Sequence, residues 1–467
     1  MTAFLHDDFL LSGDNARALF HGHAKNMPIA DYHCHINPAD IAANRSFDNI
    51  AQLWLAGDHY KWRLMRAHGL PEDVVTGNAP DYDKFRAWCS VMPYCAGNPL
   101  YTWAHMELRR YFGFDKVLSP ETCDEAWEAT RERLRDRSMN AVGIVEQSNV
   151  RFLCTTDDPA DSLTHHKSIR NGSPIGFKVL PTFRPDAAIN IDKPGFAAYI
   201  VCLGAAAGAR INSFDSLFDA LNRRIDFFHS MGCLCADHGF EAVPFLRQTP
   251  SLRADAIFIK ALAGGTVSIE EAQVYKTELF LRLAAAYKAR KWALQIHFGP
   301  SRNNSSRLMS LLGPDVGGDA IGGQSNILPM TRLLDALDRD GNLPKTILYS
   351  LNPADNTALD ALIGSFPFDG VPCKIQHGSA WWFSDNARGI RDHLTSLAAN
   401  SVLGHFVGML TDSRSLLSYV RHEYFRRVLC DVVGSFADSG VFPADLPLLG
   451  RLVEDVCYNN AVRYFGF

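Results

Sequence analysis

Short apolar runs alternate with longer stretches of helical periodicity over most of the chain. Each run is rich in β-branched or aromatic residues, ends in polar residues and is followed by a helical pattern. The runs are 28–35, 149–154, 176–183, 233–236, 292–296, 346–350, 373–376 and 405–410. Strands that alternate with helices in this way favour a closed parallel barrel over an open sheet. We therefore predict an α/β fold of the (β/α)8 TIM-like barrel type.

Two of the intervening segments carry clear helix signals. Phe214, Leu217 and Leu221 recur at the spacing of one helix face. Ser268 is followed three residues later by Glu271, which is the pattern of a capping box at the start of a helix. Both segments are typical of helices that cover the outside of a barrel.

The stretch 39–148 has a different character. Apolar residues such as Phe47 and Ile50 recur there at helical spacing, and strand signals are few. We predict a large helical insertion after the first strand. The expected organisation is 1–38 as an N-terminal helix and barrel strand one, 39–148 as the insertion, and 149–467 as the remainder of the barrel.

Two histidines stand one residue apart at the end of the first predicted strand. Alternate residues of a strand share a face, so His33 and His35 can both face one metal ion, although the same spacing also occurs in ordinary strands. Strand eight of a closed barrel pairs with strand one, which brings Asp412 to the same place. Two imidazoles and a carboxylate suit one divalent ion, zinc or manganese. His297, after the fifth strand, is a further ligand, a hydrogen-bonding partner or a core histidine.

Composition and charge exclude several classes of protein. A net charge of -5 with 47% apolar and 21% charged residues is typical of a soluble globular chain and argues against nucleic-acid or membrane binding. The 11 cysteines contain no Cys-x-x-Cys pair, which indicates reduced thiols in the cytoplasm. We see no signal peptide and no apolar stretch long enough to span a bilayer, and we expect a cytoplasmic protein.

Several motifs then point to one family. They lie at 31–35, 59–63, 182–186, 295–299, 381–383, 411–414 and 459–461. With these motifs the whole chain resembles the uronate isomerase (glucuronate isomerase) family of the amidohydrolase superfamily. The histidine pair alone marks only the superfamily, whereas His59-Tyr60, Trp381-Trp382 and the run from Thr411 are far more specific.

The resemblance implies an aldose–ketose isomerase acting on a small-molecule uronate. It would interconvert D-glucuronate with D-fructuronate, and D-galacturonate with D-tagaturonate. A base must take the C2 proton and return it at C1, and another group must move a proton between the two oxygens. The metal ion would polarise the C1 carbonyl or the C2 hydroxyl and stabilise the developing oxyanion. We also expect a homo-oligomer.

The resemblance also suggests roles for individual side chains. Asp412 is placed to move a hydroxyl proton, and His59 and Tyr60 are candidates for the shuttle near C1 and C2. Without the resemblance, Tyr60 would be interpreted as an aromatic on a helix face. Together with His297 and Arg414, these residues are the expected catalytic set.

Positive charge and an apolar wall complete the expected site. Arg184, Arg302 and Arg414 are candidates to bind the carboxylate or the enediolate oxygens, although Arg302 alone would be an ordinary surface arginine. Trp381 and Trp382 would offer a wall for the C–H face of the sugar, although adjacent tryptophans are more often core residues.

Two other functions compete with the isomerase. In a metal-dependent hydrolase or decarboxylase of the same superfamily, the ion would generate hydroxide and Asp412 would be the base. Many two-metal relatives add a bridging lysine after the fourth strand; here Asp237-His238 stands there, which favours a single ion. A non-catalytic sugar-acid binding protein has no reason to gather imidazoles and a carboxylate on adjacent strand ends.

Overall fold

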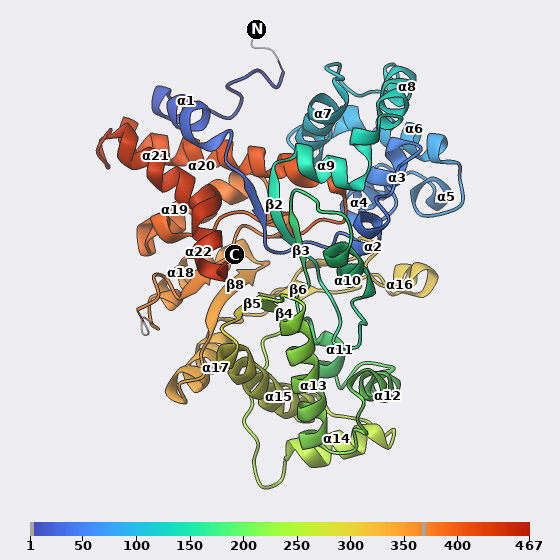
Figure 1. The fold of residues 1–467 in the computed structure, drawn as a ribbon, viewed down its shortest axis with the longest axis vertical. Coiled ribbons are helices and arrows are strands. Elements are labelled where there is room, and N and C mark those ends of the chain that lie inside the picture. The colour runs from blue at the N-terminus through green and yellow to red at the C-terminus, as the bar shows by residue number, and fades with distance from the viewer. Residues whose placement is uncertain (1–3, 367–369) are drawn as a thin grey trace.

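Two parallel sheets form the centre of the molecule. The computed structural model describes residues 4–366 and 370–467. The sheets have the strand orders β1-β2-β3 and β4-β5-β8-β9 (Figure 1). Their strands are β1 Ile29–Asp31, β2 Val150–Cys154, β3 Lys178–Leu180, β4 Cys235–Phe240, β5 Ala293–Phe298, β8 Lys345–Ser350 and β9 Ile375–His377. The predicted α/β class, with parallel strands in chain order, is confirmed.

The two sheets are joined by single bridges rather than by a continuous ladder. Phe183 bridges in parallel to both Asp157 and Ala236, which links the end of the first sheet to β4. On the other side, backbone hydrogen bonds connect the segment 406–413 to the chain after β1: Asp412 donates to the His33 carbonyl at 3.2 Å, and His35 donates to the Ser413 carbonyl at 2.9 Å. Within the described residues no ladder closes the barrel into one sheet.

The prediction of a strand at 405–410 is wrong. Leu403–His405 is a short 3-10 helix, and the residues that follow join no sheet. Gly408 and Asp412 both have left-handed backbone angles, with φ of 82° and 47°. A strand cannot continue through such residues. A side chain at Gly408 would also place its Cβ 2.1 Å from the carbonyl oxygen of Val456, so this turn requires glycine.

Helices surround the strands. Both predicted helix signals are confirmed, and Ser268 caps α15 in a complete capping box with Glu271. Figure 1 shows the C-terminal helices α18 to α22 on one side of the strands and the insertion on the other. The helices outside the insertion are α1 Asp14–Leu19, α10 Thr164–Asn171, α11 Asp186–Ile189, α12 Phe196–Ala207, α13 Phe214–Ser230, α14 Ala254–Leu262, α15 Ile269–Ala289, α16 Ser306–Leu312, α17 Ile327–Arg339, α18 Asn356–Ile363, α19 Ala387–Asn400, α20 Val420–Asp438, α21 Leu446–Glu454 and α22 Asn460–Phe465.

Only helices lie between β1 and β2, where the insertion was predicted. They are α2 Pro38–Ala42, α3 Ile50–Trp54, α4 His59–Ala67, α5 Glu72–Val75, α6 Asp81–Val91, α7 Pro99–Phe112, α8 Cys123–Leu134 and α9 Ala141–Gln147. The strands β6 (Pro300–Ser301) and β7 (Ala320–Ile321) pair antiparallel, and the end of the connection between them lies against α4. Arg63 donates to the Asp319 carbonyl at 2.6 Å, and Arg66 donates to the Val316 carbonyl. The insertion and the loop after β5 are therefore bound to each other.

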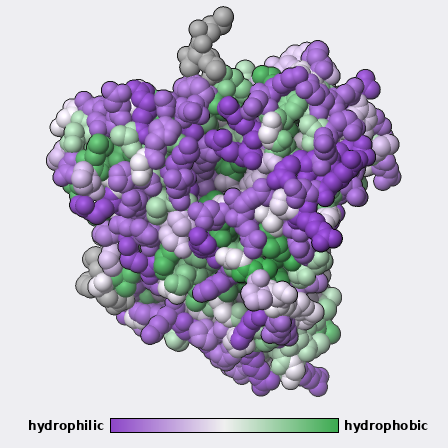
Figure 2. Space-filling view, turned by 45° about the horizontal axis from the view of Figure 1, so that its top comes forward, coloured by the Kyte–Doolittle hydropathy of each residue, from purple (hydrophilic) through white to green (hydrophobic). Residues whose placement is uncertain are grey.

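One face of the molecule is mostly polar. Hydrophilic residues dominate the face shown in Figure 2, and hydrophobic residues occur on it in separate patches. Among the described residues, no helix has the length and apolar character that crossing a membrane requires.

Candidate active site

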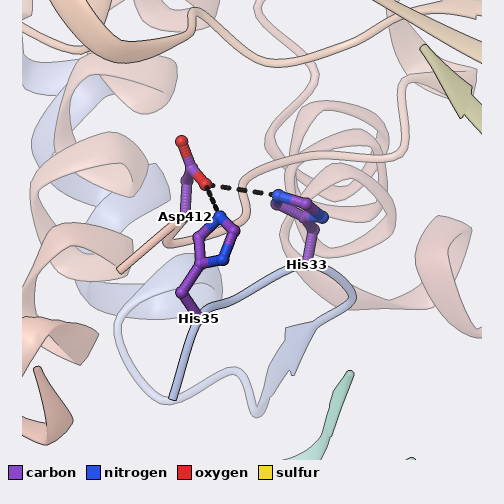
Figure 3. A group of neighbouring side chains, drawn as sticks. All are labelled: His33, His35 and Asp412. Atoms are coloured by element: carbon purple, nitrogen blue, oxygen red, sulfur yellow. Dashed lines mark ion pairs between the residues drawn. The ribbon is translucent and has the colours of Figure 1, made fainter. Parts of the chain in front are cut away.

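His33, His35 and Asp412 converge on one point (Figure 3). The Nε2 atoms of His33 and His35 lie 3.2 and 3.0 Å from the same carboxylate oxygen, Oδ1 of Asp412. The histidines were predicted within the first strand, but β1 ends at Asp31 and both follow it. Their rings are 5.2 Å apart and nearly perpendicular. The backbone bonds between this segment and 412–413 take the place of the strand pairing that we predicted.

Buried groups fix the backbone beside Asp412. Asp31, which is fully buried, accepts hydrogen bonds from the Thr411 N–H at 2.8 Å and from its hydroxyl at 2.7 Å. On the other side, Arg421 donates to the Thr411 carbonyl at 3.2 Å. The position of Asp412 is therefore set by contacts to β1 and to α20 and does not depend on a regular strand.

A second carboxylate–imidazole pair lies behind the first. His297, near the end of β5, makes a 2.7 Å hydrogen bond from Nδ1 to Oδ1 of Asp237, near the middle of β4. Arg184 lies 3.1 Å from the other oxygen of Asp237, and His33 Nδ1 lies 3.9 Å from it. Asp237 was not predicted as a site residue. Its place beside His297 on neighbouring predicted strands was the signal that could have identified it.

Several of these groups could hold a metal ion. His33, His35 and Asp412 form one possible ligand group, and His33, Asp237 and His297 form another, each with its ligand atoms within 4.8 Å of one another. His33 Nδ1 and His297 Nε2 are buried and have no hydrogen-bond partner among the described residues. Buried imidazole nitrogens without partners, beside carboxylates, fit a divalent cation.

Burial and contacts with one another shift the pKa values of these histidines and carboxylates. For Asp412, burial raises the pKa, but hydrogen bonds from His33 and His35 outweigh it and hold the pKa well below its ordinary value. For His33, burial lowers the pKa, and the carboxylates of Asp237 and Asp412 raise it above the ordinary value. Burial lowers the pKa of His35 to about 4. Asp412 is thus a carboxylate anion at neutral pH, and His35 is neutral.

The insertion contributes His59 and Tyr60 at the start of α4. The Asp58 side chain caps this helix by accepting hydrogen bonds from the N–H groups of Tyr60 and Lys61. The His59 and Tyr60 rings stack 4.7 Å apart. Arg414 donates to His59 Nδ1 at 3.1 Å, which leaves the ring proton on Nε2. Burial raises the pKa of Tyr60 well above its ordinary value, so the phenol keeps its proton.

The other two predicted arginines are held by carboxylates. Arg184 donates to Asp186 at 2.8 Å and pairs with Asp237. Arg302 donates to Asp319 at 2.8 Å and lies over the Trp382 ring at 5.3 Å. Neither arginine is a free surface residue, and each retains further N–H donors that a ligand could use.

The two tryptophans are buried at the rim of the site. Trp381 and Trp382 are only 7% and 9% exposed. The Trp381 indole N–H donates to Oδ2 of Asp412 at 2.8 Å, and its ring lies 4.8 Å from His297. Trp382 packs edge-on against His59 at 5.3 Å. Trp381 is thus a hydrogen-bond donor as well as an apolar surface.

One cavity of about 300 Å³ collects all of the predicted residues. Asp237 lies behind its wall, whereas Thr156 and Asp315 line it and were not predicted. The lining residues are His33, His35, His59, Tyr60, Thr156, Arg184, His297, Arg302, Asp315, Trp381, Trp382, Asp412 and Arg414.

Known proteins match this chain over its length. A family model described as Glucuronate isomerase matches residues 1–465. The chain belongs to the glucuronate isomerase family. A uronate isomerase of Lachnospira eligens is 47% identical over 467 residues, which cover 100% of both chains. One from Vibrio vulnificus is 48% identical over 466 residues, covering 100% of this chain and 99% of the other.

A solved structure of the family supports the fold as well. The crystal structure of a uronate isomerase from Thermotoga maritima superposes with a TM-score of 0.94 at 34% identity. The match covers 99% of this chain and 100% of that one. The predicted family and the barrel-like α/β architecture are therefore confirmed.

Proposed function

We propose that this enzyme is an aldose–ketose isomerase that interconverts D-glucuronate with D-fructuronate and D-galacturonate with D-tagaturonate. The observation that carries the proposal is the single cavity that joins an anionic Asp412 to three arginines and to two proton-bearing rings, His59 and Tyr60. The full-length match to the family supports it. A uronate needs positive charge at its carboxylate, and an enediolate needs proton donors at its oxygens.

The proton assignments follow from the states of the side chains. From the resemblance we expected Asp412 to move a hydroxyl proton; here we assign it instead to the C2 proton, because its low pKa keeps it ionised. The same carboxyl would return that proton to C1. The hydroxyl proton of O2 would pass to O1 through the Tyr60 hydroxyl, which gives its own proton to O1 as it takes the one from O2. The Nε2–H group of His59 would donate a hydrogen bond to the developing oxyanion. No water is consumed and the proton count is unchanged.

The three arginines would hold the negative charge of the substrate. Arg184 and Arg302 have fixed orientations through Asp186 and Asp319, and they are the proposed partners of the C6 carboxylate. Arg414 lies beside His59 and is the proposed partner of the enediolate oxygens. Trp382 would cover the C–H face of the sugar.

A divalent cation fits the same group, and we propose zinc, with manganese as the alternative. His33, His35 and Asp412 would hold it, with His297 as a further ligand or a hydrogen-bonding partner. When bound, the cation supplies positive charge to oxygen atoms of the substrate. In the chain itself, Asp237 fixes His297 through Nδ1, which leaves Nε2 directed away from Asp237.

A metal-dependent hydrolase or decarboxylase of the same superfamily is the alternative. The family match favours the isomerase. In β4, Asp237 and His238 stand where a bridging lysine would be needed for a second ion. We also propose a cytoplasmic location, which the 11 free cysteines support. The homo-oligomer stays a prediction.

The test follows ketose formation from D-glucuronate by proton NMR in heavy water. We expect the ketose to appear, with deuterium at C1 to the extent that the proton on Asp412 exchanges with solvent. Release of carbon dioxide without ketose would favour the decarboxylase. Incubation with zinc that yields no ketose from D-glucuronate or D-galacturonate would reject the isomerase.

A further inference from the structure

The two oxygens of the Asp412 carboxylate have different surroundings. Oδ1 lies 3.2 and 3.0 Å from the imidazole nitrogens of His33 and His35. Oδ2 accepts a 2.8 Å hydrogen bond from the indole N–H of Trp381. An indole N–H can only donate, so it distinguishes one oxygen of a carboxylate from the other.

Side-chain rotation is the main freedom that the backbone leaves to Asp412. Thr411 is bound on both sides, by Asp31 and by Arg421. The Asp412 N–H donates to His33, and its φ of 47° lies in the left-handed region. With the main chain fixed, the orientation of the carboxylate depends on its own hydrogen bonds.

Packing fixes the Trp381 indole in turn. Its ring meets His297 edge-on at 4.8 Å, and that imidazole stacks on Tyr349 at 4.2 Å with 4° between the planes. Gly378 makes room for the Tyr349 ring, because a Cβ at this position would lie 2.1 Å from it. The indole therefore cannot turn away from Asp412 without displacing a close-packed set of rings.

We propose that Trp381 is a positioning residue that reserves Oδ2 of Asp412 for the substrate while Oδ1 faces the imidazole pair. The inference rests on the proposed function and adds to it separate roles for the two oxygens of one carboxylate. Without the indole donor, the carboxylate would rotate until both oxygens face His33 and His35. An ion held there would then have two oxygen ligands from Asp412 in place of one, and the base would be withdrawn from C2.

The test replaces Trp381→Phe, which keeps an aromatic ring and removes only the donor and part of the surface. The purified apoenzyme is loaded with cobalt(II), whose visible absorption weakens when the coordination number rises. We expect weaker absorption in the variant than in the wild type. We also expect kcat to fall by roughly tenfold or more, with KM within about threefold, as for loss of a hydrogen bond to a charged group.

Trp292→Phe is the matched control. The Trp292 indole is also buried and donates to a side chain, His229 Nδ1 at 3.1 Å, but it lies outside the cavity. Its cobalt spectrum and kcat should equal those of the wild type. An unchanged spectrum and kcat in Trp381→Phe would overturn the proposal.

A second replacement covers the case in which Trp381→Phe does not fold. Benzothienylalanine at position 381 exchanges the indole N–H for sulfur and keeps the shape of the ring. It should reproduce both changes, and wild-type behaviour would again overturn the proposal. Wild-type enzyme that makes no ketose would reject the proposed function, whereas the cobalt spectra would still decide the role of Trp381.

Discussion

The imidazole of His33 lies between two carboxylates, one on a regular strand and the other on an irregular segment. Asp237 belongs to β4, which pairs with β5 along its full length, and its side chain is 0% exposed. Asp412 belongs to a segment that joins no sheet, and its side chain is 18% exposed. Asp237 approaches Nδ1 of the ring at 3.9 Å, and Asp412 approaches Nε2 at 3.2 Å.

The difference matches the two roles that we propose, which are support for Asp237 and proton transfer for Asp412. The regular ladder buries Asp237 and pairs it with Arg184 and His297, so its charge is already compensated. The irregular segment leaves Asp412 open to the cavity, where a substrate can reach it. In a continuous strand, the regular alternation of side chains would have set the direction of the Asp412 side chain. The left-handed backbone at residue 412 lets this side chain point in a different direction. Substitutions at the two carboxylates and at their neighbours should therefore have different effects on turnover and on stability.

The largest effect is expected for Asp412→Asn. The amide cannot accept the C2 proton, and it is a poor partner for a cation, so turnover should fall by roughly 10³-fold or more. The melting temperature should stay close to that of the wild type, because the backbone anchors remain. Ketose formation by NMR, together with thermal unfolding, measures both. Turnover near the wild-type level would remove Asp412 from the mechanism.

Asp237→Asn should have a smaller effect on turnover and a larger one on stability. It weakens the bond to His297 and leaves Arg184 without one of its charge partners, so we expect turnover to fall about 10–100-fold and stability to fall by about 3 kcal/mol. Asp360→Asn is the control, because Asp360 is a buried partner of His377 at 2.7 Å that does not line the cavity. Equal turnover losses in the two variants would show that the effect of Asp237 is only structural.

Arg414→Met should lower kcat/KM by about tenfold and leave unfolding nearly unchanged. Arg414 is exposed and donates to His59, so its removal costs charge at the cavity with little packing. Arg388→Met, on a side chain that is 91% exposed, is the control for loss of a surface charge. Equal kcat/KM values for Arg414→Met and the wild type would contradict the proposed role.

The smallest effect, on stability alone, is expected for Asp157→Asn. Burial raises the pKa of Asp157 to about 7, and its neighbour His166 is neutral at that pH because burial lowers its pKa to about 4. The folded state therefore holds a proton on Asp157 that the unfolded chain releases near pH 4, and the contribution of Asp157 to stability falls as pH rises from 4 to 7. The variant should gain on the order of 1 kcal/mol at pH 8 and nothing at pH 4. Identical differences at both pH values would show that Asp157 is ionised throughout, as Asp237 is.

The sequence predicted the residues of the cavity better than it predicted the strands that carry them. His33, His35 and Asp412 converge as expected, although neither segment is a strand at that point. The apolar run at 405–410 has the composition of a strand, but the left-handed angles at Gly408 and Asp412 depend on contacts with distant residues. No pattern along the chain contains such information.

Other features could not be predicted because they depend on three-dimensional pairing. Asp237 was visible in the sequence beside His238, but its bonds to Arg184 and His297 join three segments that are far apart in the chain. The hydrogen bond from the Trp381 indole to Asp412 could not be predicted either, because it depends on the orientation of the ring. The adjacency of the two tryptophans in the sequence does not give this orientation. Residue types and strand order are enough to predict where a site lies. The directions of its hydrogen bonds can be determined only from the packed structure.

The bonds from Arg63 and Arg66 to main-chain carbonyls of the loop after β5 have a consequence for protein engineering. The two segments are far apart in the sequence. The guanidinium groups of the insertion can donate to these carbonyls only when the loop keeps its present backbone path. A chimera that takes its helical insertion from one parent and this loop from another would join parts that were not selected together. Recombination libraries should therefore exchange the two segments as a single block.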